Sequence, residues 1–186
     1  MEKTLHIFDF DDTLVISGAK IIVNHHDGTS KDLDSHTFAT YKQQPGEEFD
    51  FSQFDLYPPD ARIIPEIFQE LKDAISLSGV ESVVILTARG KPGPVRQFLS
   101  DSGISPVPEV VAVGDSNPLK KASYVSKRLS THEYTIVRLF EDSMKNINAI
   151  GEVVEKQGII FDYTKVDSSP TTLREYISEL LKFKWL

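Results

Sequence analysis

The chain has 186 residues, of which 40% are hydrophobic, contains no cysteine and carries a formal net charge of −8 at pH 7. This length suits one domain with a modest insertion, and the lack of cysteine excludes disulfides and zinc–thiolate sites. The acidic balance argues against a nonspecific nucleic-acid or anionic-membrane binder. Because no segment approaches the ~20 apolar residues of a membrane span and the N-terminus lacks the apolar core of a signal peptide, we expect a cytoplasmic protein without a membrane partner.

The first predicted element is a buried strand in the run LHIFDFDDTLV, residues 5–15. The run carries Asp9, Asp11 and Asp12 at the end of its apolar part. Burying a carboxylate without a partner costs several kcal/mol. The three acids therefore predict a cationic partner that the written sequence does not contain.

Residues 17–60 form an insertion directly after this strand. Three kinds of element are predicted within it: a hairpin with strands at 20–24 and 30–33 and a turn at 27–28, a short helix at 35–41 and a loop at 44–59. An insertion at the mouth of the first strand is in position to act as a cap or lid.

Aromatic and histidine side chains of the insertion have two interpretations each. We expect its aromatic residues to form a small core, in preference to a base-stacking platform: Phe38, Tyr41, Phe49, Phe51 and Phe54. We expect His25 and His26 to be solvated turn residues, because the hairpin tip offers no third ligand for a metal.

The rest of the chain alternates apolar, β-branched runs with helical patterns. Strands are predicted at 82–86, 109–113, 134–140 and 158–161, and helices at 65–77, 94–102, 119–129, 144–157 and 168–181. This alternation predicts right-handed βαβ units, and hence an α/β, doubly wound, Rossmann-like parallel sheet of five strands. The expected division is a catalytic core of residues 1–16 and 61–186 and a small cap insertion at 17–60.

Polar residues gather where the predicted strands end, which is where open parallel sheets bind ligands. The first strand ends in the acids named above, the second in Thr87-Ala88-Arg89, and the fourth in Glu141-Asp142-Ser143. Two carboxylates and a main-chain carbonyl suffice for Mg²⁺, which keeps several waters. A strand-end carboxylate can attack phosphorus, and a second carboxyl two residues on can transfer the proton. Thr and Lys side chains can stabilise the phosphoryl oxygens.

With these residues in place, the sequence resembles the haloacid dehalogenase (HAD) superfamily. Its DxDxT motif is matched by Asp9 to Thr13, its second motif by Thr87, and its acidic fourth motif by Glu141-Asp142. The resemblance implies that Asp9 is the nucleophile and a Mg²⁺ ligand, and that Asp11 is the acid/base and a ligand through its carbonyl. It implies that Asp142 is the remaining protein ligand of the metal.

The third HAD motif is a lysine near the start of a helix, for which Lys121 is preferred and Lys120 is the near rival. The phosphate-binding residues expected on this basis are Thr87, Ala88, Arg89 and Lys121. Supporting roles fall to Asp12, Thr13, Glu141 and Asn146, of which Asn146 is expected to hydrogen-bond a neighbouring acid of the site. Arg89 is interpreted as a phosphate clamp, with a salt bridge as its alternative role.

The resulting hypothesis is a Mg²⁺-dependent phosphomonoesterase that forms an aspartyl-phosphate and acts on a small phosphorylated substrate, as a monomer or homodimer. Asp11 argues against a dehalogenase, because that branch of the superfamily lacks this acid. The chain also resembles the phosphatase half of phage-type polynucleotide kinase-phosphatases, which implies a nucleic-acid 3′ end as an alternative substrate. The acid-rich insertion disfavours a long polyanion, although Lys120, Lys121, Lys127 and Arg128 could hold a phosphate end. A phosphotransferase or mutase and a non-enzymatic phospholigand- or protein-binding module are further alternatives.

Overall fold

A parallel five-stranded sheet forms the centre of the computed structural model, which describes residues 2–168. The strand order is β10-β9-β1-β7-β8. The strands are β1 (Thr4–Phe8), β7 (Val83–Thr87), β8 (Glu109–Ala112), β9 (Ile136–Glu141) and β10 (Ile160–Lys165). Every pairing in this sheet is parallel, so the predicted doubly wound α/β fold is confirmed. β10 extends four residues beyond the predicted strand, because its exposed polar residues hide its end in the sequence.

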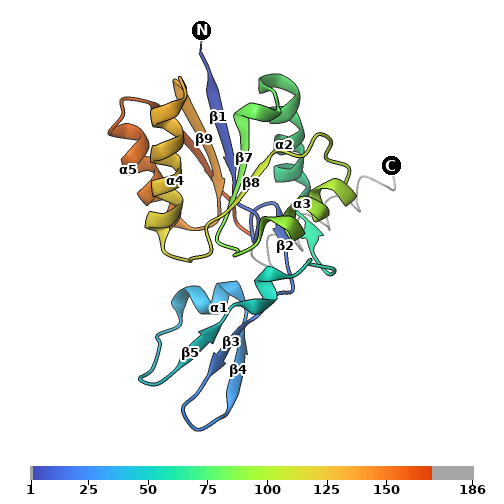
Figure 1. Ribbon diagram of the computed structural model, residues 1–186, viewed down its shortest axis with the longest axis vertical. Coiled ribbons are helices and arrows are strands. Elements are labelled where there is room, and N and C mark those ends of the chain that lie inside the picture. The colour runs from blue at the N-terminus through green and yellow to red at the C-terminus, as the bar shows by residue number, and fades with distance from the viewer. Residues whose placement is uncertain (1, 169–186) are drawn as a thin grey trace, which may run out of the picture.

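Two helices cover each face of this sheet, as Figure 1 shows. The helices α2 (Pro65–Ser78) and α3 (Pro92–Asp101) lie on one face, and α4 (Pro118–Thr131) and α5 (Met144–Glu155) lie on the other. The strands supply both faces by alternation: Phe8 and Ile85 pack with α2 and α3, whereas Ile7 and Val84 pack with α4 and α5. The core is therefore two apolar layers separated by the sheet.

The insertion leaves the core through a short two-stranded stem. β2 (Val15–Ile16) pairs antiparallel with β6 (Arg62–Ile63). Beyond the stem lie a second sheet, in the order β4-β3-β5, and two helical segments. The elements are β3 (Ile21–Asn24), β4 (Ser30–Leu33), α1 (Ser35–Thr40), β5 (Glu48–Asp50) and the 3₁₀ helix η1 (Ser52–Asp55). We refer to residues 17–60 as the cap, which lies below the carboxyl ends of the core strands in Figure 1.

The predicted hairpin of the cap is confirmed, but the prediction of a loop over residues 44–59 is wrong. β5 pairs with β3 as a third strand, and η1 follows it. β5 consists of only three residues, two of them acidic, so neither its length nor its composition indicates a strand.

A buried carboxylate holds the cap together. The Glu47 carboxylate accepts hydrogen bonds from the Tyr41 hydroxyl at 2.8 Å and the Gln44 backbone N–H at 2.7 Å. Its Oε1 atom also lies 2.9 Å from His25 Nδ1. The Gln44 backbone N–H, with Tyr41 and His25, lowers the pKa of Glu47. His25 lies at the hairpin turn as expected, but its ring is only partly exposed and meets Glu47, an acid just before the strand that sequence reasoning missed.

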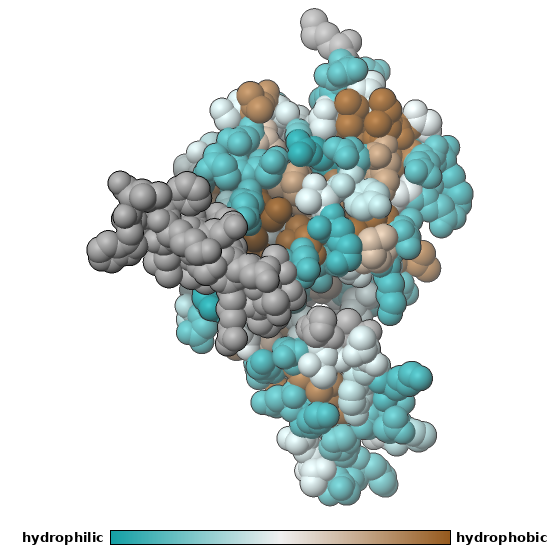
Figure 2. All heavy atoms as spheres, turned by 180° about the vertical axis from the view of Figure 1, so that it is seen from behind, coloured by the Kyte–Doolittle hydropathy of each residue, from teal (hydrophilic) through white to brown (hydrophobic). Residues whose placement is uncertain are grey.

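The surface of the cap is largely hydrophilic in the view from behind (Figure 2). Among the helices of the described residues, none combines the length and apolar character needed to cross a membrane. The helix expected at 168–181 lies outside the described residues, apart from its first position.

A helical glycine provides a test of this packing. A Cβ atom at Gly151 of α5 would lie 2.7 Å from Phe161 Cε1 of β10. We expect Gly151→Val to lower the free energy of unfolding by about 1–3 kcal/mol through overpacking. The control Ser100→Val, at an exposed position of α3, should change it by less than about 0.5 kcal/mol. Urea denaturation of both variants measures the difference, and equal costs would contradict the described contact between α5 and β10.

Candidate active site

Two acids meet because β1 and β9 are paired in register. Phe8 lies opposite Phe140, and their rings stack at 4.4 Å between centroids on the face of α2 and α3. The next residues, Asp9 and Glu141, therefore turn together to the opposite face. The Asp9 backbone N–H donates to the Phe140 carbonyl at 3.0 Å, which carries the ladder to the end of both strands.

A buried lysine lies between these two acids. Lys121, in the first turn of α4, places Nζ 2.7 Å from Asp9 Oδ1 and 2.8 Å from Glu141 Oε2. The helix begins here because Asn117 caps it by accepting from the Leu119 backbone N–H, and Pro118 occupies its first turn. Lys120 is exposed and Lys121 is buried, so the structure brings Lys121 into the site as predicted.

Further hydrogen bonds hold Glu141 in place. Its Oε1 atom accepts from the Asn146 side chain at 3.0 Å and from the Ser143 backbone N–H at 3.2 Å. The expectation that Asn146 binds a neighbouring acid is confirmed. Since both oxygens of Glu141 already accept hydrogen bonds, this residue positions Lys121.

The electrostatics of the cluster show an excess of negative charge. Burial, followed by the nearby Glu141, raises the pKa of Asp9 to about 8, against the opposing effect of Lys121. Burial, then Asp9 and Glu141, raise the pKa of Asp142 to about 9. Burial alone would lower the pKa of Lys121, but Asp9 and Glu141 outweigh it and raise that pKa. Three carboxylates thus face one ammonium group.

This cluster fits a divalent cation. Asp9, Glu141 and Asp142 each offer a carboxylate oxygen, and the three oxygens lie within 4.8 Å of one another. Oxygens about 2.1 Å from a Mg²⁺ ion lie roughly 3–4 Å apart, so the spacing is compatible with its octahedral shell. Asp9 and Asp142 are the better ligands because Glu141 is already engaged by Lys121 and Asn146. The predicted contribution of the Asp11 carbonyl stays a prediction.

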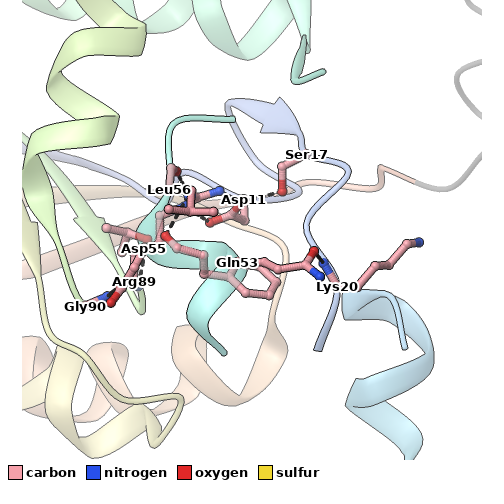
Figure 3. Close-up of polar contacts among 10 residues, drawn as sticks. Asp11, Ser17, Lys20, Gln53, Asp55, Leu56, Arg89 and Gly90 are labelled. Atoms are coloured by element: carbon pink, nitrogen blue, oxygen red, sulfur yellow. Dashed lines mark hydrogen bonds and ion pairs between the residues drawn. The ribbon is translucent and has the colours of Figure 1, made fainter. Parts of the chain in front are cut away.

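Asp11 belongs to a second, separate charge pair (Figure 3). Arg89 Nε donates to Asp11 Oδ2 at 2.8 Å and its Nη2 donates to Asp11 Oδ1 at 2.7 Å, a bidentate pair. Ser17, the first residue of the cap, donates its hydroxyl to the same Oδ1 at 2.7 Å. In this structure the Asp11 carboxylate is held toward the cap.

The third nitrogen of Arg89 binds the cap itself. Its Nη1 donates to the carbonyls of Phe54 at 2.7 Å and Leu56 at 3.1 Å. The next backbone N–H, that of Gly90, donates to Asp55 at 3.1 Å. The interpretation of Arg89 as a phosphate clamp is therefore wrong for this conformation, since all three of its side-chain nitrogens bind Asp11 or the cap. This junction gave no signal in the sequence, because its acceptors include main-chain carbonyls.

The rings of Phe10 and Phe54 complete the surroundings of Arg89. Its guanidinium carbon lies 5.1 Å from the centre of the Phe10 ring and 5.5 Å from that of Phe54. Phe54 thus belongs to the junction. The other four residues that were predicted to form a small aromatic core in the cap do contact one another through their rings: Phe38, Tyr41, Phe49 and Phe51.

The remaining predicted residues lie at or just after the ends of strands β1 and β7, at the edge of the sheet that faces the cap. Thr87 ends β7, and its hydroxyl oxygen accepts from the Arg89 backbone N–H at 3.2 Å. Asp12 adopts a left-handed backbone, φ 58°, in the turn after β1. The Thr13 side chain is fully buried, and its hydroxyl has no hydrogen-bond partner within residues 2–168. Thr87, Ala88 and Asp12 line a cavity between the strand ends and the cap.

The basic residues grouped in the sequence do not form one patch. Lys121 is buried in the acid cluster, whereas Arg128 reaches β8, where it pairs with Glu109 at 2.7 Å. Lys120 and Lys127 are exposed. Lys120 and Lys127 are seven positions apart, as are Lys121 and Arg128, so the residues of each pair share a face of α4. The side chains of Lys121 and Arg128 are bound by acids, however, and of the four only Lys120 and Lys127 are exposed.

The cavity lies between the core strand ends and the cap and has a volume of about 730 Å³. Asp9, Asp11, Lys121 and Asp142 line its core side. Phe38, Tyr41, Phe51 and Phe54 line its cap side. Both charge pairs therefore face one space large enough for a small organic ligand.

The Arg89 junction can be tested without an activity assay. Arg89→Met leaves the Asp11 carboxylate without its bidentate partner and should lower the free energy of unfolding by about 3 kcal/mol. It should also speed proteolysis within residues 17–60, since the cap loses its main polar contact with the core. Urea denaturation and limited proteolysis measure these effects. The control is Arg96→Met, which changes an exposed arginine of α3; equal behaviour of the two variants would contradict the role of the junction.

Comparison with known proteins adds support for the fold alone. A crystal structure of the Legionella pneumophila effector Ceg4 is similar to this chain, with a TM-score of 0.54 and 14% sequence identity. The match covers 98% of this chain and 94% of that chain. No protein-family model and no curated protein matches the sequence. The chain thus shares its overall fold with a solved protein of low sequence identity.

Proposed function

We propose that this protein is a Mg²⁺-dependent phosphomonoester hydrolase of the HAD type that works through an aspartyl-phosphate. The observation that carries the proposal is the position of Asp9. Asp9 directly follows the central strand β1. Its carboxylate contacts Lys121 at 2.7 Å and lies beside Asp142, within the cavity that Asp11 also lines. A nucleophile, a cation site and a proton-transfer group thus share one space.

In the first step, one Asp9 oxygen attacks the phosphorus atom of the ester and the bond to the alcohol oxygen breaks. The ammonium group of Lys121 lies next to Asp9 and can stabilise the charge on the phosphoryl oxygens. The Thr87 hydroxyl lines the same cavity and can donate to those oxygens. A Mg²⁺ ion at Asp9 and Asp142 would supply further charge stabilisation for the phosphoryl group.

Proton transfer is assigned to Asp11. Its carboxyl protonates the departing alcohol oxygen, and it then takes a proton from the water that attacks the aspartyl-phosphate. The products are the alcohol and inorganic phosphate, with Asp9 restored. Because Asp11 is paired with Arg89 and Ser17 in the structure, its side chain must turn from the cap junction toward the leaving oxygen. Arg89 is on this view a positioning residue that links Asp11 to the cap.

The acids around the cavity favour a small substrate over a polynucleotide 3′ end. Among residues 2–168, seven acidic and three basic side chains line the space, and two of the basic ones, Arg89 and Lys121, are already paired with acids. A chain of phosphates extending through it would meet carboxylates at several points.

Replacing the nucleophile tests the mechanism. Asp9→Asn should lower kcat for a generic aryl phosphate by about three orders of magnitude or more, because an amide oxygen is a poor nucleophile. Its thermal unfolding should stay cooperative. Asp115→Asn is the matched control, since Asp115 lines the same cavity but bonds the Asn117 backbone N–H of a turn. Full activity in Asp9→Asn would refute the mechanism.

Metal dependence has a readout apart from turnover. Mg²⁺ at about 100 times its Kd should stabilise the fold by about 2.7 kcal/mol and raise Tm by roughly 5–10 °C. The shift should disappear in Asp142→Asn and persist in Asp115→Asn, and chelation by EDTA should abolish turnover. An equal Mg²⁺ shift in both variants would place the ion elsewhere.

A further inference from the structure

The cavity is larger than phosphoryl transfer requires, and its cap side is aromatic. A volume of about 730 Å³ lies within the range of about 300–1,000 Å³ that holds small organic ligands. Its wall on the cap side includes Phe38, Tyr41 and Phe51, together with other cap residues: Ile21, Ser35, Ser52, Phe54 and Asp55. The non-phosphate part of a substrate whose phosphoryl group reaches Asp9 would therefore meet aromatic side chains.

These rings are arranged as an open platform. Phe38 contacts Phe51 edge to face, with centroids 5.4 Å apart and planes at 85°. Phe51 is 40% exposed although it is apolar, and both residues line the cavity. Phe49 packs against both rings, at 5.1 Å and 6.3 Å, from the position behind them in β5. A small core closed on itself would not leave an aromatic ring facing the cavity.

The acidic side chains around the cavity limit which other groups a substrate with an aromatic ring can carry. Asp12, Asp55 and Asp115 line the cavity around the catalytic acids, and Lys145 is its one basic residue outside the two charge pairs within the described part of the chain. A second or third phosphate on the substrate would lie near these carboxylates. A substrate with a single phosphate and an otherwise uncharged body avoids that repulsion.

We propose that the substrate is a monophosphate that carries a planar aromatic ring, with the phosphoryl group at Asp9 and the ring against Phe38 and Phe51. This inference rests on the proposed phosphatase function and names its substrate class. Two sources share this chemistry, an aryl phosphate and a nucleoside monophosphate. Aromatic rings favour one another in edge-to-face or offset geometry beyond the area they bury, which a saturated ring of the same size cannot reproduce.

The test compares benzyl phosphate with cyclohexylmethyl phosphate, which have the same number of carbons and both release a primary alcohol. The wild-type protein should favour benzyl phosphate in kcat/KM by roughly three- to tenfold. In Phe51→Leu and Phe38→Leu the preference should fall below about twofold, because leucine keeps the apolar contact but lacks the ring. Tyr57→Leu is the matched control and should keep the wild-type preference, since Tyr57 is an aromatic residue of the cap that is as exposed as Phe51 but does not line the cavity.

Each outcome decides a different point. Equal use of both esters by the wild type, or an equal loss of preference in Tyr57→Leu, would overturn the aromatic platform while leaving the phosphatase proposal intact. If neither ester nor any other monophosphate is hydrolysed with Mg²⁺, the proposed function itself fails.

The two sources are separated with phenyl phosphate and a nucleoside 5′-monophosphate. The ratio of kcat/KM between wild type and Phe51→Leu is measured for each, so that leaving-group reactivity cancels. The larger loss identifies the natural class, and a ratio near one for both substrates would overturn the proposal.

Discussion

The ammonium group of Lys121 between Asp9 and Glu141 is the interaction on which the site depends. In-register pairing of β1 with β9 brings the two acids side by side, and the stack of Phe8 on Phe140 turns them toward α4. One lysine cannot neutralise two acids and Asp142, so the cluster retains a demand for positive charge. Sheet register and the start of α4 together thus produce a cluster in which acids outnumber the one lysine.

Arg89 performs the corresponding task at the junction with the cap. It balances Asp11 and at the same time satisfies two main-chain carbonyls of the cap, while Phe10 and Phe54 cover its guanidinium group. The acid cluster and this junction share the cavity but divide the charges between them. Asp11 can consequently respond to the cap, whereas Asp9 is held by the core.

Sequence reasoning predicted the parts of the molecule that depend on local pattern. Apolar β-branched runs located the sheet, and strand-end acids located Asp9, Asp11 and Asp142 near one another. β5 was missed because three residues with two acids carry no strand signal. The partners of Arg89 could not be predicted either, because Asp11, Phe54 and Leu56 lie 78, 35 and 33 residues away from it in the chain. Only the folded chain shows that Arg89, which was predicted to bind phosphate, is bound to Asp11 and to the cap.

The two-residue stem of β2 and β6 has a consequence for how such proteins diversify. The cap enters and leaves the core at adjacent positions, Val15 opposite Ile63, so its length can change without shifting the register of β1. An exchanged cap would have to supply the same junction contacts, which include carbonyl acceptors for Arg89 and an acceptor for the Gly90 N–H. The insertion can therefore change in length and sequence while the arrangement of acids at the strand ends stays the same.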